Sequence, residues 1–323
     1  MDFSAAFNTV QPNLLLERLY NLGVSNWLII WIREFLKNRQ QRVCVNHAMS
    51  DCSVLNIGVP QGCVLSPLLF SIYINELQCN IDDNLTLIKY ADDLALVSCQ
   101  EEMNSSLYFR YIDSIIDWFG KSSLHLNIGK TKELCLGSQT RRVDTGLFKP
   151  VTINGQIVEQ VSNFKYLGTI IDNKLNFNSN VEAVYKKASQ RLYLLRKLRS
   201  FNVSTQTLNL AYRSLIESVL TYNIVSWFGN TTLKQKKKLA QIINQANKIT
   251  GHKQHSLKIL FDSFMEKRAV VIFKDNTHPL HSAFELLPSG RRFRIPKARR
   301  NAYKKSFIPM AVVVLNWINV CSE

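Results

Sequence analysis

Two apolar, β-prone runs flank a short acidic centre in the range Leu85–Cys99, which reads LTLIKYADDLALVSC. The tight Ala-Asp-Asp centre predicts a hairpin turn, and the flanking runs predict its two strands. The hairpin therefore carries two adjacent carboxylates, Asp92 and Asp93, at its tip. Composition agrees with a folded chain, because 46% hydrophobic and 20% charged residues are ordinary globular values and exclude a disordered or coiled-coil chain.

Adjacent carboxylates with apolar neighbours repel each other, and ionising both is costly unless a cation joins them. Oxygen-only donors select a hard ion such as Mg²⁺, which commonly binds one or two carboxylates together with substrate phosphates. Two such ions can clamp the attacking and leaving oxygens of a phosphoryl transfer, but they need a further carboxylate. Asp2 is the candidate. The alternative is that Asp92 and Asp93 simply close a solvated turn.

The first 176 residues mix helical and strand patterns. Apolar spacing predicts helices over Asn13–Leu22, Ser25–Leu36, Leu68–Leu77 and Leu107–Phe119. Short strands are predicted over Arg42–Asn46, Ser53–Gly58, Leu124–Asn127, Lys132–Leu136 and Phe164–Ile171. We therefore predict a mixed α/β unit over residues 1–176.

Long helical patterns without strands follow residue 176. They cover Val181–Leu198, Thr207–Phe228 and Leu233–Ile249. We predict an all-helical unit over residues 177–255 and a basic, partly ordered tail over residues 256–323. No apolar run approaches the length of a membrane span, which is about eighteen residues. No secretory signal is present either. We therefore expect an intracellular protein that does not bind membranes.

The positive charge is concentrated in the second half of the chain. Residues 1–160 hold 13 basic and 16 acidic residues, whereas residues 161–323 hold 27 and 8, for a net charge of +16 overall. The basic clusters are Lys186–Arg199, Lys234–Lys238 and Arg291–Arg300. Such a surplus is expected of a protein that binds a phosphate backbone. A merely soluble basic surface, a nuclear-localisation signal and attraction to anionic lipid are the alternatives.

Five segments along about the first 170 residues resemble, in order, the palm motifs of reverse transcriptases of non-LTR (LINE-type) retrotransposons. They read MDFSAAFNTV, GVPQGCVLSPLLF, IKYADDLALVS, LNIGKTKELCLG and FKYLGTIID. The later segments QRLYLLRKLRSFNVS and HPLHSAFELLPSGRRFRIPKARR resemble the thumb and tail of such proteins. The resemblance implies an α+β polymerase palm, a mixed sheet with packed helices, over residues 1–176, followed by an all-helical thumb. It also implies an RNA-directed DNA polymerase that uses Mg²⁺ and deoxynucleoside triphosphates to extend a DNA primer on an RNA template.

The resemblance assigns roles to individual residues of the palm. Asp2, Asp92 and Asp93 match the catalytic aspartates that hold two Mg²⁺ ions. Phe7 matches the aromatic residue that crowds the sugar 2′-hydroxyl, with a buried core Phe as the alternative. Further matches are Gln61 and Gly62, which line the incoming nucleotide, and Lys130, which lies near the departing pyrophosphate. An exposed loop lysine is the alternative for Lys130.

The resemblance also implies contacts with the template and primer. Tyr166, Leu167 and Gly168 match the primer-grip turn, with mere packing as the alternative. The basic residues of the predicted thumb helix suit a template and primer duplex. They are Lys186, Lys187, Arg191, Arg196 and Arg199. The basic clusters, and the need of such elements to reach chromosomes, predict residence in the nucleus, whereas no oligomeric state is predicted.

In complete members of the family the first catalytic aspartate follows a fingers region, whereas in this chain it is Asp2. We therefore expect a truncated copy in which the strand of Asp2 frays, Mg²⁺ and nucleotide binding are weakened, and polymerase activity is impaired. The alternative is a non-catalytic nucleic-acid-binding remnant of the element. A metal-dependent nuclease is a third possibility, but it would leave the Gln61 turn and the primer-grip turn without a purpose.

Overall fold

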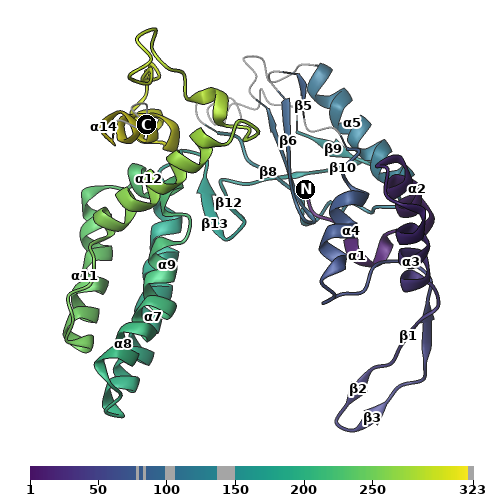
Figure 1. Cartoon of the computed structure of the whole chain (residues 1–323), viewed down its shortest axis with the longest axis horizontal. Coiled ribbons are helices and arrows are strands. Elements are labelled where there is room, and N and C mark those ends of the chain that lie inside the picture. Colours follow the sequence, from purple (N-terminus) through teal and green to yellow (C-terminus); the bar gives the residue numbers. More distant parts are fainter. Residues whose placement is uncertain (78–79, 83–84, 99–105, 137–149, 319–323) are drawn as a thin grey trace. The chain divides into compact units, whose positions relative to one another are not determined.

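The computed structural model of the chain describes residues 1–77, 80–82, 85–98, 106–136 and 150–318 (Figure 1). It contains two compact units. The first contains Met1–Cys135 and residues 150–161, and the second contains Leu136 and the chain from Ser162 onward. The sequence analysis placed the segment Phe164–Ile171 in the first unit, and this segment is a hairpin. The structure places it in the second, because it packs against the long helix α7 (Asn178–Ser200).

The first unit combines helices with small sheets. Its described helices are α1 (Ala6–Thr9), α2 (Pro12–Asn21), α3 (Asn26–Leu36), α4 (Leu65–Tyr73) and α5 (Ser106–Lys121). Its strands are β1 (Arg39–Gln41), β2 (Cys44–Val45), β3 (Ala48–Met49), β4 (Ser53–Leu55), β5 (Asn80–Asp82), β6 (Leu85–Tyr90), β7 (Asp93–Ser98), β8 (Lys132–Glu133), β9 (Thr152–Ile153), β10 (Gln156–Ile157) and β11 (Glu159–Gln160). Strands β5, β6 and β7 form an antiparallel sheet, β8 pairs with β11 in parallel, and the other strands form antiparallel pairs.

One apolar core joins the helices of the first unit to the β6–β7 hairpin. Along β6, Leu85 and Leu87 are buried while Thr86 and Ile88 are exposed, as the twofold alternation of a strand requires. Leu87 and Leu94 pack among the buried side chains of the helices. These are Leu15, Leu19, Leu36, Phe70, Tyr73, Ile115 and Phe119. The predicted helices thus exist as α2, α3, α4 and α5, although α4 ends four residues before the predicted end at Leu77.

A buried arginine braces three helices of the first unit. The Arg18 guanidinium pairs with Glu76 at 2.9 Å, donates to the Ser122 hydroxyl at 2.8 Å and donates to the Tyr73 carbonyl. The Tyr73 hydroxyl in turn donates to the Ser122 carbonyl at 2.6 Å. These bonds join α2, the end of α4 and the end of α5, and therefore hold α4 in place against the hairpin.

The second unit is helical beyond its first hairpin, and its helices continue past residue 255, where the sequence analysis expected a basic, partly ordered tail. Its strands are β12 (Asn163–Tyr166) and β13 (Thr169–Asp172), and its α-helices are α7, α8 (Thr205–Tyr212), α9 (Ser218–Thr221), α10 (Ile224–Trp227), α11 (Leu233–Thr250), α12 (Leu257–Lys274), α13 (Asn301–Lys304) and α14 (Phe307–Ile318). Residues Arg213–Glu217 form a π-helical turn between α8 and α9. Short 3-10 turns cover Phe228–Asn230 and His281–Ala283.

Three sequence predictions differ from the observed elements. The single strand predicted over Phe164–Ile171 is a hairpin, because Leu167 and Gly168 take left-handed φ values of 43° and 82°. The single helix predicted over Thr207–Phe228 is broken at the π-helical turn and at Asn223, whose φ is 48°. The strand predicted over Leu124–Asn127 is reduced to one isolated bridge between Leu126 and Phe3.

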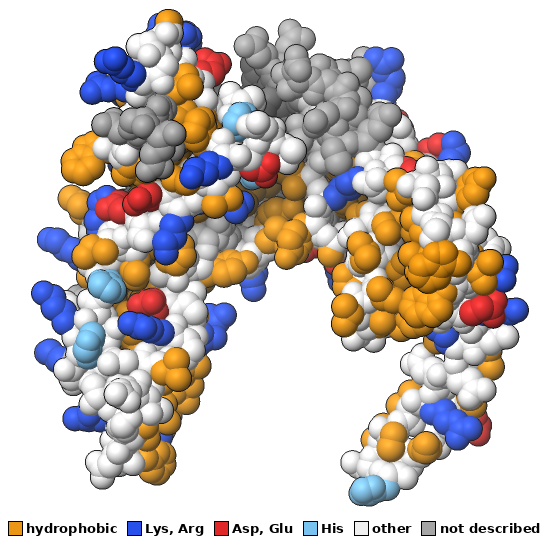
Figure 2. Space-filling model, in the orientation of Figure 1, with side chains coloured by type: hydrophobic (Ala, Val, Ile, Leu, Met, Phe, Trp, Pro, Cys, Tyr) orange, Lys and Arg blue, Asp and Glu red, His pale blue; other side chains and the backbone are white. Residues whose placement is uncertain are grey.

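The basic C-terminal region contributes to the core of the second unit. Phe261 and Met265 on α12 and Leu315 on α14 are buried in the same cluster as the side chains of α7 and α11. Phe293, which lies within the arginine-rich segment, is only 1% exposed. In the part of the chain that the structure describes, no helix has both the length and the apolarity that a bilayer crossing needs. Figure 2 shows Lys and Arg side chains spread over the second unit and hydrophobic side chains gathered around α3 of the first.

Candidate active site

The acidic hairpin predicted over Leu85–Cys99 is present as strands β6 and β7, although its last residue lies outside the described residues. Tyr90 pairs with Asp93, so that Ala91 and Asp92 form a two-residue turn. Ala91 takes a left-handed φ of 50°, as tight hairpin turns require. Asp92 is half-buried and Asp93 is exposed. The prediction of two adjacent carboxylates at a hairpin tip is confirmed.

Asp2 reaches this hairpin through backbone pairing. The Met1 amine nitrogen donates to the Leu94 carbonyl at 2.7 Å, and the Leu94 N–H donates to the Met1 carbonyl at 3.3 Å. On its other side, the Asp2 carbonyl accepts from the Asn127 N–H at 2.8 Å, and the Asp2 N–H donates to the Thr131 hydroxyl at 3.3 Å. The expectation that this segment frays was therefore wrong, because it is hydrogen-bonded along both edges.

The three carboxylates act on one another electrostatically. Partial burial raises the pKa of the Asp93 carboxyl above its ordinary value, and the negative charges of Asp92 and Asp2 raise this pKa further. Like charges within reach of one another disfavour ionisation. The pairing of Met1 with Leu94 thus places Asp2 in the same electrostatic field as the two acids of the turn.

Lys130 also lies at this site. Its ammonium nitrogen is 3.6 Å from a carboxylate oxygen of Asp2, and its side chain is 70% exposed. The turn that carries Lys130 is held by Asn127, whose side-chain oxygen accepts from the Lys130 N–H at 3.1 Å. The structure therefore brings together four of the residues that the sequence singled out, namely Asp2, Lys130, Asp92 and Asp93.

The carboxylate oxygens of this site suit a hard divalent cation, although the acids do not already form a cluster of metal ligands. Among the described residues, no three His, Cys, Asp or Glu side chains lie close enough together to hold a metal ion. Partial burial and, after it, repulsion from Asp92 and Asp2 raise the pKa of Asp93, and a bound cation would relieve the repulsion. Asp2, Asp92 and Asp93 are the residues that could hold such an ion.

A pocket of about 460 Å³ lies beside the N-terminus of α4. It is lined by Phe7, Gln61, Gly62, Cys63, Val64, Ser66 and Pro67. Phe7 stacks on Phe70 with ring centres 5.0 Å apart, and the Gln61 amide donates to the Asn8 side-chain oxygen at 3.2 Å. The structure therefore gathers the three residues that the sequence assigned to the nucleotide, namely Phe7, Gln61 and Gly62, in one concave site.

Gly58, which the sequence analysis did not single out, allows its own segment to approach the backbone of Phe7 and Asn8. A Cβ at Gly58 would lie 2.8 Å from the Phe7 carbonyl oxygen and from the Asn8 Cα. The close approach allows two backbone hydrogen bonds of 2.7 Å, from the Gly58 N–H to the Val10 carbonyl and from the Val59 N–H to the Phe7 carbonyl. The glycine at the head of GVPQG is the signal that could have identified it.

The predicted primer-grip residues form the turn of the β12–β13 hairpin in the second unit. The Tyr222 hydroxyl donates to the Leu167 carbonyl at 2.6 Å, and the Tyr222 ring lies 3.1 Å from where a Cβ of Gly168 would be. The Asn223 amide donates to the Thr169 hydroxyl at 3.1 Å. The turn is therefore held by the residues that separate α9 from α10.

The predicted basic face of α7 is mostly exposed. Lys186, Lys187, Arg196 and Arg199 are exposed, whereas Arg191 is half-buried and donates to the Leu215 carbonyl at 2.5 Å. Tyr193 is 63% exposed, while its neighbour Leu192 is buried. The helix buries Leu192 in the core of the second unit and turns Tyr193 to solvent, so this aromatic lies among the exposed basic residues.

An acidic hairpin joined by a third aspartate, next to a glycine-containing turn that opens a helix, has the features of a polymerase palm. Residues 1–171 match the family model described as "Reverse transcriptase (RNA-dependent DNA polymerase)". Because this match covers more than half of the chain, the protein belongs to the reverse transcriptase family. A short match over residues 177–218, to "Alkylated DNA repair protein alkB homolog 8, N-terminal", covers little more than α7 and α8 and shows no second family.

The curated relatives are proteins of mobile elements. The chain is 28% identical to "Probable RNA-directed DNA polymerase from transposon BS" of Drosophila melanogaster, over 70% of this chain and 26% of the relative. It is 28% identical to "RNA-directed DNA polymerase from mobile element jockey" of Drosophila funebris, over 59% and 21%. A type-1 retrotransposable element R2 polyprotein of Popillia japonica is 22% identical over 61% and 36%. The resemblance to LINE-type reverse transcriptases is confirmed, and the chain spans about a quarter of the length of the first two relatives.

Proposed function

We propose that this chain is the palm and thumb part of an RNA-directed DNA polymerase of a non-LTR retrotransposon, and that it extends a DNA 3′ end on an RNA template. The observation that carries the proposal is the pairing of Met1 with Leu94, which sets Asp2 beside Asp92 and Asp93. Three carboxylates from two distant segments are what phosphoryl transfer with two metal ions needs. The names of the curated relatives support the same activity.

In this proposal Asp2, Asp92 and Asp93 hold two Mg²⁺ ions. Bound Mg²⁺ would neutralise the phosphate charges and stabilise the attacking and leaving oxygens of the transfer. Lys130 provides a positive charge on the Asp2 side of the site, where the pyrophosphate departs. Its exposed ammonium is free to move from Asp2 to a phosphate.

The pocket beside α4 is proposed to take the incoming deoxynucleoside triphosphate. Phe7 would meet the sugar and disfavour a 2′-hydroxyl, which its stacking on Phe70 supports by fixing the ring. Gly62, with φ +79° and no neighbouring atom within 4 Å of a Cβ position, leaves open space for the ligand. Gln61 supplies both a hydrogen-bond donor and an acceptor.

The second unit is proposed to hold the template and primer. Tyr166, Leu167 and Gly168 would seat the primer strand, and the basic residues of α7 would contact phosphates. These are Lys186, Lys187, Arg191, Arg196 and Arg199, of which Arg191 also holds the Leu215 carbonyl. Nuclear residence follows from the same proposal, because the DNA primer of a mobile element is chromosomal.

A second candidate function is nucleic-acid binding without catalysis. Two observations favour it. The Lys130 ammonium nitrogen lies 3.6 Å from a carboxylate oxygen of Asp2. Among the described residues, no three metal-ligating side chains lie close enough together to hold an ion. A remnant of this kind would bind RNA and DNA through phosphate contacts alone.

Primer extension with Asp92→Asn separates the two functions. We expect the wild-type chain to incorporate labelled deoxynucleotides on a primed RNA template in the presence of Mg²⁺, and Asp92→Asn to lose this activity while keeping its affinity for the template. The matched control is Asp113→Asn, an exposed acid on α5. Template binding by the wild type without any Mg²⁺-dependent extension would favour the non-catalytic binder.

A further inference from the structure

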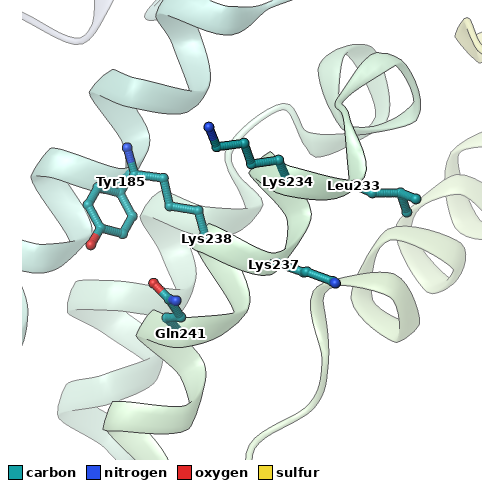
Figure 3. A pocket seen from close by; sticks show the side chains of 6 residues that line it. All are labelled: Tyr185, Leu233, Lys234, Lys237, Lys238 and Gln241. Carbon is teal, nitrogen blue, oxygen red and sulfur yellow. The ribbon is translucent and has the colours of Figure 1, made fainter.

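The second unit contains a cavity that none of the roles above uses. It measures about 630 Å³ and lies where α7 and α11 pack together (Figure 3). Its lining residues are Tyr185, Leu233, Lys234, Lys237, Lys238 and Gln241. Tyr185 comes from α7 and the other residues come from α11. The cavity therefore belongs to a helix pair within one unit.

The charge of this helix pair is strongly unbalanced. Helix α11 contains five lysines and no acidic residue, and α7 contains six basic residues and one acid, Glu182. Glu182 is already paired with Lys238 at 2.5 Å. The remaining cations have no acid on either helix to neutralise them, so the cavity attracts anions.

The side chains at the cavity are arranged to present positive charge. The Lys238 ammonium lies 4.4 Å from the centre of the Tyr185 ring, which holds its long side chain in place. Figure 3 shows Lys234 and Lys238 extending toward the Tyr185 side, whereas Lys237 extends away. Lys234 is exposed. Lys234, which no acid of either helix neutralises, therefore presents a positive charge on this side of the cavity, whereas the Lys238 ammonium is shared with Glu182. Lysine binds a phosphate as a point charge.

Polar groups continue this surface along the two helices. Gln241 and Gln245 follow Lys238 at helical spacing on one face of α11. The Gln245 side-chain oxygen accepts from the Arg196 guanidinium at 2.8 Å, so Arg196 lies at the α7–α11 crossing further along. A row of cations and amides of this kind suits a chain of phosphates.

We propose that the α7–α11 cavity binds the phosphodiester backbone of single-stranded nucleic acid. This inference rests on the proposed function and extends it, because it adds Lys234 and Lys238 of α11 to the contacts assigned to α7. The cavity is of the size that encloses a small ligand such as a nucleotide.

The test is fluorescence anisotropy with a labelled single-stranded RNA of about 12 nucleotides. We expect Lys234→Gln/Lys238→Gln to bind about tenfold more weakly and to lower the slope of log affinity against log salt by about 1.4, since each lost phosphate contact lowers it by about 0.7. The control is Lys267→Gln/Lys274→Gln on α12, which removes two exposed lysines outside the cavity. Circular dichroism checks folding, and Lys234→Gln alone leaves the Glu182 pair intact.

An RNA affinity and a salt slope that are unchanged in both α11 variants would overturn the proposed binding site. Equal losses in the α12 control would overturn it too, since the effect would then be one of net charge. So would a phosphopeptide that binds more tightly than the RNA in a Lys234-dependent manner. These outcomes are separate from the polymerase proposal, which stands or falls with Asp92→Asn.

A different observation carries a second inference, at Lys89 in β6. The Lys89 ammonium donates to three backbone carbonyls, those of Ile74 at 3.1 Å, Asn75 at 3.2 Å and Leu77 at 2.8 Å. These carbonyls lie just beyond the last residue of α4, near the end of the helix that carries partial negative charge. The Ile74 carbonyl also accepts from the Leu77 N–H at 3.3 Å. All three ammonium hydrogens are therefore used in holding the hairpin to α4.

Lys89 also faces the pairing that brings in Asp2. Its partner across the hairpin is Leu94, the residue whose backbone is bonded to Met1. The N-terminal end of the same helix α4 borders the pocket of Phe7. We infer that Lys89 is a positioning residue, which sets the acidic turn relative to the nucleotide pocket by holding both to α4.

Calorimetric titration with Mg²⁺ tests this role without any need for turnover. We expect Lys89→Met to weaken Mg²⁺ binding by about tenfold, and Lys89→Arg, which keeps donors for the carbonyls, to restore most of it. The control for general destabilisation is Leu87→Ala, a buried residue of the same strand. It should lower the melting temperature and leave Mg²⁺ affinity near that of the wild type.

Mg²⁺ affinity that is the same in Lys89→Met and wild type would overturn the positioning role alone. Equal weakening in Leu87→Ala would also overturn it, because any loosening of the strand would then suffice. A wild-type chain that binds no Mg²⁺ would overturn this role together with the metal site of the proposed function.

Discussion

Met1 and Leu94 form a backbone pair closed by two hydrogen bonds, although they lie 93 positions apart in the chain. This pair joins the first segment to the strand that begins with Asp93. It sets Asp2 beside the acidic turn, where partial burial and the charges of Asp92 and Asp2 raise the pKa of the Asp93 carboxyl. The site is therefore a property of strand pairing, and its tests concern the segments that make the pairing possible.

Asp93→Asn should stabilise the metal-free protein at neutral pH. The pKa of Asp93 in the folded state is raised above its ordinary value of 3.8 by partial burial, Asp92 and Asp2. Ionisation of Asp93 therefore disfavours folding, and this penalty is present above the folded-state pKa and absent at pH values below 3.8. Melting curves followed by circular dichroism should show a higher melting temperature for the variant at neutral pH, and the difference should vanish in acid. A variant that is less stable than wild type at neutral pH would contradict the repulsion.

Gly58→Ala should destabilise the first unit and disturb the pocket beside α4. Gly58 has a φ of +76°, and a Cβ would lie 2.8 Å from backbone atoms of Phe7 and Asn8. We expect a loss of about 2 kcal/mol or more in the free energy of unfolding, measured with urea. Gly120→Ala on α5 is the matched control, since its Cβ meets nothing within 4 Å, and it should be neutral or stabilising by up to about 1 kcal/mol.

Arg18→Met should cost stability because it removes the brace between α2, α4 and α5. Arg18 is 8% exposed and bonds to Glu76, Ser122 and Tyr73. We expect a loss of about 2–4 kcal/mol in the free energy of unfolding, because the buried Ser122 hydroxyl and Tyr73 carbonyl are left without this donor. Arg33→Met, which removes an exposed pair with Glu34, should change this free energy by less than about 1 kcal/mol. Equal effects of the two variants would contradict the brace.

Tyr222→Phe should loosen the β12–β13 turn. The variant loses the 2.6 Å hydrogen bond to the Leu167 carbonyl, which we expect to lower stability by about 0.5–1 kcal/mol. Amide hydrogen exchange at the turn should become faster. The control is Tyr193→Phe, which removes the hydroxyl of another exposed tyrosine, on α7. It should leave hydrogen exchange at the turn unchanged. Faster exchange in both variants would exclude a local role of Tyr222.

Local patterns were sufficient where an element depends on its own residues. The hairpin around Asp92 and the helix α5 follow from strand alternation and helical spacing of apolar side chains, which are properties of short segments. The same reasoning failed over Phe164–Ile171, because the left-handed pair Leu167 and Gly168 interrupts an otherwise continuous β-prone run.

The order of residues by itself determined that Asp92 and Asp93 share one hairpin turn, and the ordered motifs around them indicated the reverse transcriptase family. Only the tertiary structure decided that Asp2 joins these acids, that Lys89 holds their hairpin to α4, and that Lys234 and Lys238 meet Tyr185. The physical reason is that a turn depends on a few neighbouring residues, whereas these contacts require hydrogen bonds and packing between segments that only folding brings together.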